Sequence, residues 1–194
     1  DICSPFDLPN DGSVMKWEMF VGREHERNSI IQGHYTRVFS GRKLGKSALL
    51  MSIKRMHKPD SVNVVFITLA DVSSEDRVVD ITLQEMRRQL DFAPKLKQGL
   101  SASERIKLIW DNYALDYPND PLLLIYDESD LFVEEQLAEY SRTQEATLGF
   151  TLSRSTHVDD RGNSLIRCVF AGYRSTDTDA GAWGNWGSKL ILKP

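Results

Sequence analysis

The sequence predicts an α/β domain in which a mainly parallel sheet lies between two layers of helices. Apolar segments rich in β-branched residues alternate along the chain with segments whose apolar residues recur every three or four positions. Such alternation is typical of βαβ crossovers, which make neighbouring strands parallel and cover both faces of a sheet. At 194 residues the chain can form one well-buried domain with a small appendage.

Five segments are predicted to be strands. Residues 35–39 are rich in β-branched and aromatic residues and run directly into a glycine-containing turn. Residues 62–69 and 122–126 are almost continuous apolar runs, as expected of parallel strands that are buried on both faces. The last two predicted strands are residues 165–171 and 189–192.

Helices are predicted between these strands from the spacing of apolar residues and from capping signals. They cover residues 24–32, 48–58, 79–90, 103–113 and 134–153. Either Ser101 or Ser103 is expected to cap the fourth helix. A polar turn is expected at residues 159–163.

Composition and charge narrow the class of protein. The net charge of −4 argues against a broadly basic surface for nucleic acid, although it leaves room for a local basic patch. Cys3 and Cys168 have neither metal nor redox spacing, so a reducing cytoplasm is the expected location. Since no apolar run approaches the roughly 20 residues of a membrane span, no membrane partner is expected.

The turn after the first strand resembles a phosphate-binding loop. Residues 40–47 read SGRKLGKS and match the pattern G-x-x-x-x-G-K-[ST] except that Ser40 replaces the first glycine. In such a turn, backbone N–H groups converge on a phosphate at the N-terminus of the next helix. Lys46 would bridge the β- and γ-phosphates, and the Ser47 hydroxyl would bind Mg²⁺. A plain surface turn is the alternative, but the strand before it and the amphipathic helix after it favour phosphate binding. The nucleotide-binding residues predicted in this turn are Gly41, Arg42, Lys43, Leu44, Gly45, Lys46, Ser47 and Ala48.

A pair of acidic residues follows the most apolar strand, as in a Walker B motif. Asp127 and Glu128 come directly after residues 122–126, and the carboxyl end of a parallel strand faces the same crevice as the phosphate turn. Asp127 would hold Mg²⁺ through a coordinated water, and Glu128 would act as the general base. The alternative is an acidic pair that merely ends a buried strand, but the phosphate turn about 80 residues upstream favours the metal site.

Together these features resemble the AAA+-like and STAND P-loop ATPases of the additional-strand class, above all the archaeal and bacterial ATPases related to origin-recognition proteins. Three stretches carry the resemblance: residues 20–26 (FVGREHE), 41–50 (GRKLGKSALL) and 125–130 (IYDESD). The resemblance extends over residues 19–192. It implies a three-layer αβα core with five strands in the order 5-1-4-3-2, and it implies ATP and Mg²⁺ as cofactors.

The same resemblance implies how the base is held. In that family the F-V-G-R-E segment packs near the adenine, which implies that Val21, Gly22 and Arg23 lie beside the base. An ordinary helix N-terminus is the alternative for this segment.

The resemblance further implies a polar residue after the fourth strand that senses the γ-phosphate. Arg174 is the better charge complement for this role, Ser175 is the alternative, and a solvated loop arginine is the remaining interpretation. No arginine finger is assigned, because Arg154, Arg161 and Arg167 are candidates only by position and are expected at the surface. The residues predicted to act in catalysis are Lys46, Glu128 and Arg174.

The resemblance also bears on the domain layout. Residues 1–19 are predicted to form an extended N-terminal arm, and residues 20–194 the ATPase core. A helical lid or winged-helix domain usually follows the fifth strand in that family, so the chain is expected to be a core whose flanking domains are missing.

Three functions remain open. The first is a regulatory ATPase, in signalling or anti-phage defence, whose slow and regulated hydrolysis of ATP to ADP switches neighbouring domains or a homo-oligomer. The second is a DNA-associated ATPase such as a loader, an initiator-like protein or a transposition-related protein, and the third is a scaffold that binds nucleotide without turnover. The acidic balance favours the first over the second, and Glu128 argues against the third.

Overall fold

A computed structural model describes residues 23–33, 35–40, 45–56, 62–173 and 188–192. The predicted arm at residues 1–19 lies outside the described residues.

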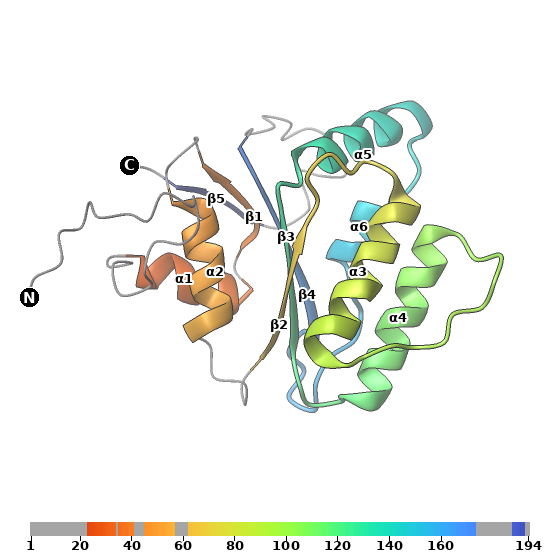
Figure 1. The fold of residues 1–194 in the computed structure, drawn as a ribbon, viewed down its shortest axis with the longest axis horizontal. Helices are drawn as coiled ribbons and strands as arrows, with labels where there is room; N and C mark the ends of the chain where they lie inside the picture. The colour runs from red at the N-terminus through yellow and green to blue at the C-terminus, as the bar shows by residue number, and fades with distance from the viewer. Residues whose placement is uncertain (1–22, 34, 41–44, 57–61, 174–187, 193–194) are drawn as a thin grey trace, which may run out of the picture.

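A five-stranded sheet forms the middle layer of the domain (Figure 1). Its order is β2-β3-β4-β1-β5, and every neighbouring pair of strands is parallel. Read from the other edge, this is the predicted order 5-1-4-3-2, which is confirmed. The strands are β1 (Tyr35–Ser40), β2 (Asn63–Thr68), β3 (Leu122–Asp127), β4 (Ile166–Gly172) and β5 (Ser188–Leu192).

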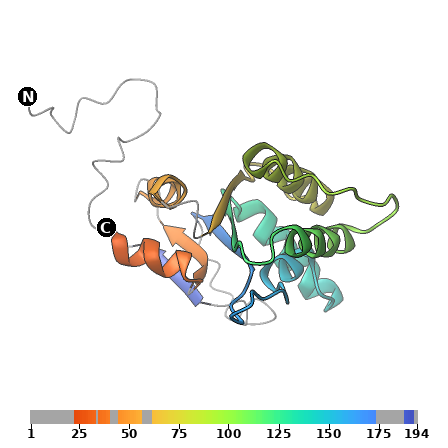
Figure 2. The same cartoon turned by 90° about the horizontal axis from the view of Figure 1, so that it is seen from below.

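Helices cover both faces of the sheet, as predicted (Figures 1 and 2). One face carries α1 (Glu24–Ile31) and α2 (Lys46–Met56). The other face carries α3 (Glu75–Leu90), α4 (Ala102–Asp116), α5 (Asp130–Thr143) and α6 (Leu148–Ser153). None of these described helices is both long and apolar enough to cross a bilayer.

The β3 strand is buried along its whole length because both of its faces meet apolar layers. Leu122, Leu124 and Tyr126 belong to the core cluster on the side of α3 and α4. Leu123 and Ile125 belong to the second cluster, together with residues of α1 and α2. Each fully buried side chain of this kind contributes about 1.5–3 kcal/mol, so β3 anchors the domain and gives its carboxyl end a rigid position.

The single helix predicted at residues 134–153 is wrong, because two helices occupy this region. The α5 helix ends at Thr143, and Gln144 adopts the left-handed conformation (φ 60°) that closes many helices. The α6 helix then begins at Leu148. The backbone N–H of Leu148 donates a hydrogen bond of 3.1 Å to a carboxylate oxygen of Glu75 in α3. A partner 73 residues away therefore provides the cap, which the local apolar spacing does not reveal.

One of the two serines proposed as the cap of the fourth predicted helix does cap it. Ser101 caps α4: its hydroxyl accepts from the backbone N–H of Glu104, and the Glu104 carboxylate accepts from the Ser101 backbone N–H. This reciprocal capping box decides between Ser101 and Ser103.

Candidate functional site

Residues from two distant motifs meet at the carboxyl edge of the sheet. Lys46 is the first residue of α2 and is buried, with 3% of its surface exposed. Its ammonium forms an ion pair with the carboxylate of Asp127, the last residue of β3. The neighbouring Ser47 hydroxyl donates a hydrogen bond of 3.0 Å to the other oxygen of the same carboxylate. Because β1 and β3 are each hydrogen-bonded to β4, the two motifs approach each other from either side of one strand.

The Asp127 carboxylate is nearly inaccessible, with 4% of the residue exposed, and it is held by three donors. In addition to Lys46 and Ser47, the backbone N–H of Glu128 donates to it at 2.9 Å. A buried carboxylate is costly unless it is paired and hydrogen-bonded, and here both conditions are met. The result is a preformed cluster of one ammonium, one hydroxyl and one carboxylate.

Gly45 shapes the entry into α2. Its φ of +76° lies in the left-handed region, which favours glycine, and its carbonyl accepts the hydrogen bond from the backbone N–H of Leu49 at 2.9 Å. No atom of the described residues lies within 4 Å of the position that a Cβ of Gly45 would occupy. Backbone conformation, rather than steric crowding, therefore requires glycine here.

Glu128 has an unusual backbone conformation for its residue type. Its φ is +54°, in the left-handed region that costs a residue with a Cβ roughly 1–2 kcal/mol. The surrounding contacts impose this turn: its N–H binds the Asp127 carboxylate, and both the N–H and the hydroxyl of Ser129 donate to the Ala171 carbonyl at 3.0 Å. The turn therefore ties the end of β3 to the end of β4, and Glu128 remains partly exposed beside Asp127.

Tyr173 is a site residue that the sequence did not single out. It directly follows β4, and its ring centroid lies 4.8 Å from the Lys46 ammonium, within cation–π range. Its backbone N–H donates to both oxygens of Asp130, at 2.9 and 3.0 Å. The strand-end argument that points to residue 174 applies equally to its neighbour, so this signal was present in the sequence.

The structure brings together four of the residues predicted for the site: Lys46, Ser47, Asp127 and Glu128. Gly45 and the half-buried Ala48 flank them at the start of α2. Other predicted residues lie outside the described residues, and their roles stay predictions: Val21, Gly22, Gly41, Arg42, Lys43, Leu44, Arg174 and Ser175.

Two further predicted positions are described. Arg23 is half-buried and occupies the N-cap position of α1, without a side-chain capping hydrogen bond. Ser40, which stands at the first glycine position of the phosphate turn, is buried at the end of β1. Its hydroxyl has no hydrogen-bond partner among the described residues. A small side chain at this position is thus accommodated inside the fold.

The three arginines considered as fingers differ in their surroundings. Arg154 and Arg161 are exposed, as expected. The expectation of a surface residue is wrong for Arg167, which is half-buried in β4 because its side chain packs against the backbone of Gly33.

The donor set at Ser47 and Asp127 fits Mg²⁺. This ion prefers oxygen ligands and usually takes only one or two carboxylates from the protein, its remaining ligands being water and phosphate oxygens. A hydroxyl and a carboxylate 3.0 Å apart meet that preference. Within the described ranges no group of three or more His, Cys, Asp or Glu side chains could hold a metal by itself.

Comparison with known proteins identifies the fold. No model of a known protein family matches the sequence. No curated protein matches it either. Its structure is similar to that of the Aeropyrum pernix ORC2 protein, solved as ADPNP-ADP complexes, with a TM-score of 0.56 and 15% identity. It is also similar to Drosophila ORC bound to GC-rich DNA and Cdc6, with a TM-score of 0.51 and 15% identity.

The two matches cover nearly all of this chain but only part of each ORC chain. The matches cover 94% and 93% of this chain but only 50% and 63% of the respective ORC chains. At such low identity the likeness establishes the fold alone. With its parallel sheet in the order 5-1-4-3-2 between two helical layers, the chain has the AAA+-like fold of P-loop NTPases.

Proposed function

We propose that the chain is the ATP-binding and ATP-hydrolysing core of a regulatory switch protein of the AAA+-like or STAND type. The observation that carries this proposal is the meeting of Lys46 and Ser47 with Asp127 at the start of α2. An ammonium, a hydroxyl and a carboxylate beside a helix N-terminus are suited to a nucleoside triphosphate with its Mg²⁺. One of the two similar structures was solved with ADPNP and ADP, which supports an adenine nucleotide as the ligand.

Each residue has a definite role in this proposal. Lys46 binds the β- and γ-phosphates, while Ser47 and Asp127 hold Mg²⁺, the latter through a water molecule. When bound, Mg²⁺ neutralises negative charge on the phosphates. The Glu128 carboxylate accepts a proton from the water that attacks the γ-phosphorus, as the bond to the leaving ADP oxygen breaks. Arg174 responds to the presence of the γ-phosphate.

The remaining predicted contacts belong to the same proposal. Backbone N–H groups of the phosphate turn surround the phosphates, with residues 41–48 as the binding segment. Val21, Gly22 and Arg23 lie beside the adenine. These assignments rest on the family resemblance and on the sequence of the turn.

Substitution of the lysine tests the binding site. We expect Lys46→Ala to abolish ATP binding in titration calorimetry, because it removes the ammonium that binds the β- and γ-phosphates in this proposal. The exposed Lys107 offers a matched control, and Lys107→Ala should bind ATP with unchanged affinity. Since Lys46→Ala leaves a buried carboxylate unpaired, circular dichroism must first establish that the variant is folded. A folded Lys46→Ala protein with unaltered affinity for ATP would refute the assignment of the phosphate-binding turn.

The exposed Ser47 provides a second test with less risk to folding. Ser47→Ala should weaken ATP binding in the presence of Mg²⁺ and leave the binding measured with excess chelator unchanged. An equal loss with and without Mg²⁺ contradicts a role for the hydroxyl as a metal ligand.

Glu128→Gln separates hydrolysis from binding. The amide keeps the size of the side chain but cannot accept a proton from water, so ATP affinity should persist while phosphate release stops. Release of phosphate at the wild-type rate would remove Glu128 from the mechanism.

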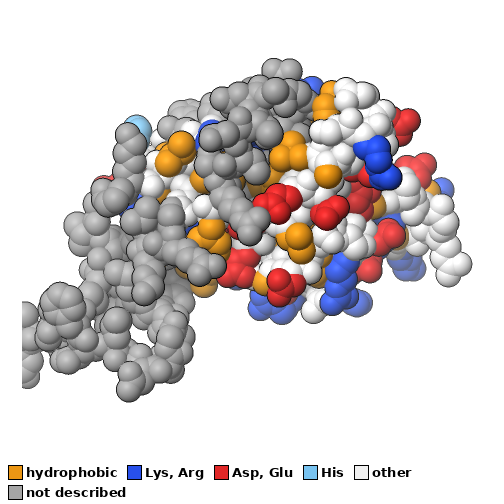
Figure 3. Space-filling model, turned by 90° about the horizontal axis from the view of Figure 1, so that it is seen from above, with side chains coloured by type: hydrophobic (Ala, Val, Ile, Leu, Met, Phe, Trp, Pro, Cys, Tyr) orange, Lys and Arg blue, Asp and Glu red, His pale blue; other side chains and the backbone are white. Residues whose placement is uncertain are grey.

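A DNA-associated ATPase is the second candidate, because one of the two similar structures holds DNA. Figure 3 favours the switch protein: Asp and Glu side chains gather on the described part of the carboxyl-edge face, with Lys and Arg side chains toward its margin. The described part of this face is therefore less suited to a phosphate backbone than a basic surface would be. Hydrolysis stimulated several-fold by duplex DNA would favour the second candidate. ATP-dependent assembly with further copies or with neighbouring domains, without a response to DNA, would favour the first.

A further inference from the structure

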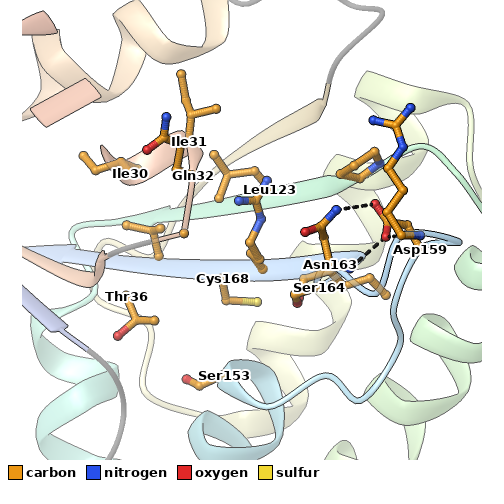
Figure 4. Close-up of a pocket in the computed structure, with 16 residues that line it drawn as sticks. Ile30, Ile31, Gln32, Thr36, Leu123, Ser153, Asp159, Asn163, Ser164 and Cys168 are labelled. Atoms are coloured by element: carbon orange, nitrogen blue, oxygen red, sulfur yellow. Dashed lines mark hydrogen bonds between the residues drawn. The ribbon is translucent and has the colours of Figure 1, made fainter. Parts of the chain in front are cut away.

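A hollow of about 590 Å³ lies at the opposite edge of the sheet, where the strands begin (Figure 4). Its walls come from the end of α1, the first residues of β3 and β4, and the segment at residues 159–164. The ladder between β1 and β4 covers only Phe170 to Gly172, so the first half of β4 has no described β1 neighbour and faces this hollow. The volume lies in the range typical of sites for small molecules.

Arg167 of β4 is a charged residue in the wall of this hollow. It lies in β4 beside Leu123 of β3, is half-buried, and its Nε is buried without a hydrogen-bond partner. A Cβ on Gly33 would come within 2.9 Å of Arg167 Cδ and 3.1 Å of its Nη1, so the α1–β1 turn packs directly on the side chain. No described residue forms a salt bridge with this guanidinium.

The electrostatic situation of Arg167 is unusual. Burial lowers the pKa of its guanidinium, and no carboxylate in the described part of the chain offsets that effect. Desolvating a cation is unfavourable unless an anion or a set of acceptors compensates for the lost water. An unpaired guanidinium at the wall of a hollow therefore favours the arrival of an anion, which its planar fork can bind through two hydrogen bonds.

The acidic residue of the hollow is already engaged elsewhere. The Asp159 carboxylate accepts from the backbone N–H groups of Arg161 and Asn163 at 2.9 and 2.8 Å, and from the Asn163 side chain at 3.1 Å (Figure 4). These bonds hold the turn at residues 159–163 in shape, and none of them involves Arg167. The exposed Arg161 also lines the hollow, and the charge of Asp159 partly offsets it.

The rest of the lining combines apolar surface with a few polar groups. Ile31 supplies accessible aliphatic surface, Leu123 and Val169 belong to the lining but are buried, and the exposed side chain of Gln32 supplies an amide. A hollow with one dominant cation and aliphatic walls is suited to a molecule that joins an anionic head to an apolar body.

We propose that this hollow binds a small molecule whose carboxylate or phosphate group pairs with Arg167 and whose apolar part contacts the aliphatic wall. The site is separate from the nucleotide site of the proposed function, because Leu123 lies four residues before Asp127, or roughly 13 Å along β3. It does not depend on whether the chain hydrolyses ATP.

The experiment uses the 194-residue chain and two probes, phenyl phosphate and benzoate, followed by two-dimensional NMR. With at least one probe we expect saturable shifts of the Gly33 backbone amide and the Asn163 side-chain amide, and benzoate should leave the Gly45 amide resonance in the phosphate turn unchanged. The probe that binds with the higher affinity shows whether the hollow prefers a phosphate or a carboxylate group. Shifts at Gly45 alone, or no saturable shift at Gly33 with either probe, would overturn the proposal.

Variants test the role of the guanidinium. Arg167→Gln should lower the affinity for the probe by at least about tenfold, since it removes a charge-assisted bidentate contact. Arg167→Lys keeps the positive charge but not the planar fork, so it should lose less affinity for the probe. It also tests the proposal if Arg167→Gln fails to fold. The exposed Arg87, which forms no salt bridge with a described residue, is the matched charge control, and Arg87→Gln should leave the affinity unchanged. Equal affinity in wild type, Arg167→Gln and Arg87→Gln would contradict the assignment.

Discussion

A single methyl group at Gly172 should disturb the end of β4 next to the proposed nucleotide site. A Cβ at this position would lie 2.4 Å from Asp130 Oδ1, 2.7 Å from Cγ and 2.9 Å from Oδ2, which are distances that real Cβ atoms do not show. No left-handed backbone is required of this glycine, and the three atoms nearest to the added methyl group all belong to the Asp130 carboxylate. Asp130 must then move away, and it would give up the Tyr173 N–H that it now accepts at 2.9 and 3.0 Å.

The magnitude follows from those contacts. Overpacking a well-packed position costs typically 1–3 kcal/mol, and the loss of a hydrogen bond to a charged group costs about 1.5–3 kcal/mol. Because moving Asp130 relieves the overlap at the expense of the hydrogen bond, these costs are alternatives, and we expect Gly172→Ala to lower the free energy of unfolding by about 2 kcal/mol. Urea denaturation followed by circular dichroism measures this difference, provided that the m-value is unchanged.

A double-mutant cycle identifies the opposing group. Asp130→Ala removes both the carboxylate and the overlap, so Gly172→Ala should cost less than about 0.5 kcal/mol in that background, which gives a coupling energy of about 1–2 kcal/mol. If Gly172→Ala costs the same with and without the Asp130 carboxylate, the steric reasoning is refuted.

Three further outcomes are expected. Gly45→Ala should destabilise the protein by about 1–2 kcal/mol, because alanine is strained at φ +76° even in open space, and Gly45→Asn should cost less in the same denaturation assay. Glu75→Ala should lower the free energy of unfolding by about 1–2 kcal/mol, since its carboxylate accepts from Leu148 N–H at 3.1 Å and from the Gln136 amide at 2.8 Å. Glu75→Gln retains an acceptor oxygen and should cost less, and equal costs for both changes would argue against the capping role. Burial raises the pKa of Tyr113 to about 12, so its protonated phenol stabilises the fold fully below the usual tyrosine value near pH 10. That contribution, about 1–2 kcal/mol, is lost as the pH rises from about 10 to 12, and wild type should lose stability over this interval more steeply than Tyr113→Phe.

Most of the strands and the centre of the site could be predicted from the sequence. The apolar run ending at Asp127 is readable because a parallel strand buried on both faces needs apolar residues at every position. The Gly45-Lys46-Ser47 turn is readable because its residue types suit phosphate binding and it stands between a strand and a helix. Both signals lie within about ten residues of chain.

The features that could not be predicted depend on partners far away in the sequence. The α6 helix is capped by the Glu75 carboxylate, and the cation–π contact between Tyr173 and Lys46 depends on the position of β4 between β1 and β3. The half-burial of Arg167 likewise depends on Gly33, from a different element.

The sequence by itself therefore determined which residues form strands, which turn suits phosphates and which acid follows the central strand, because hydrophobic periodicity and residue chemistry act locally. Only the tertiary structure decided that Lys46, Ser47 and Asp127 share one cluster while Arg167 stands unpaired among the described residues at the opposite edge. The physical reason is that burial and pairing of charges depend on which distant segments pack together, and no local pattern carries that information.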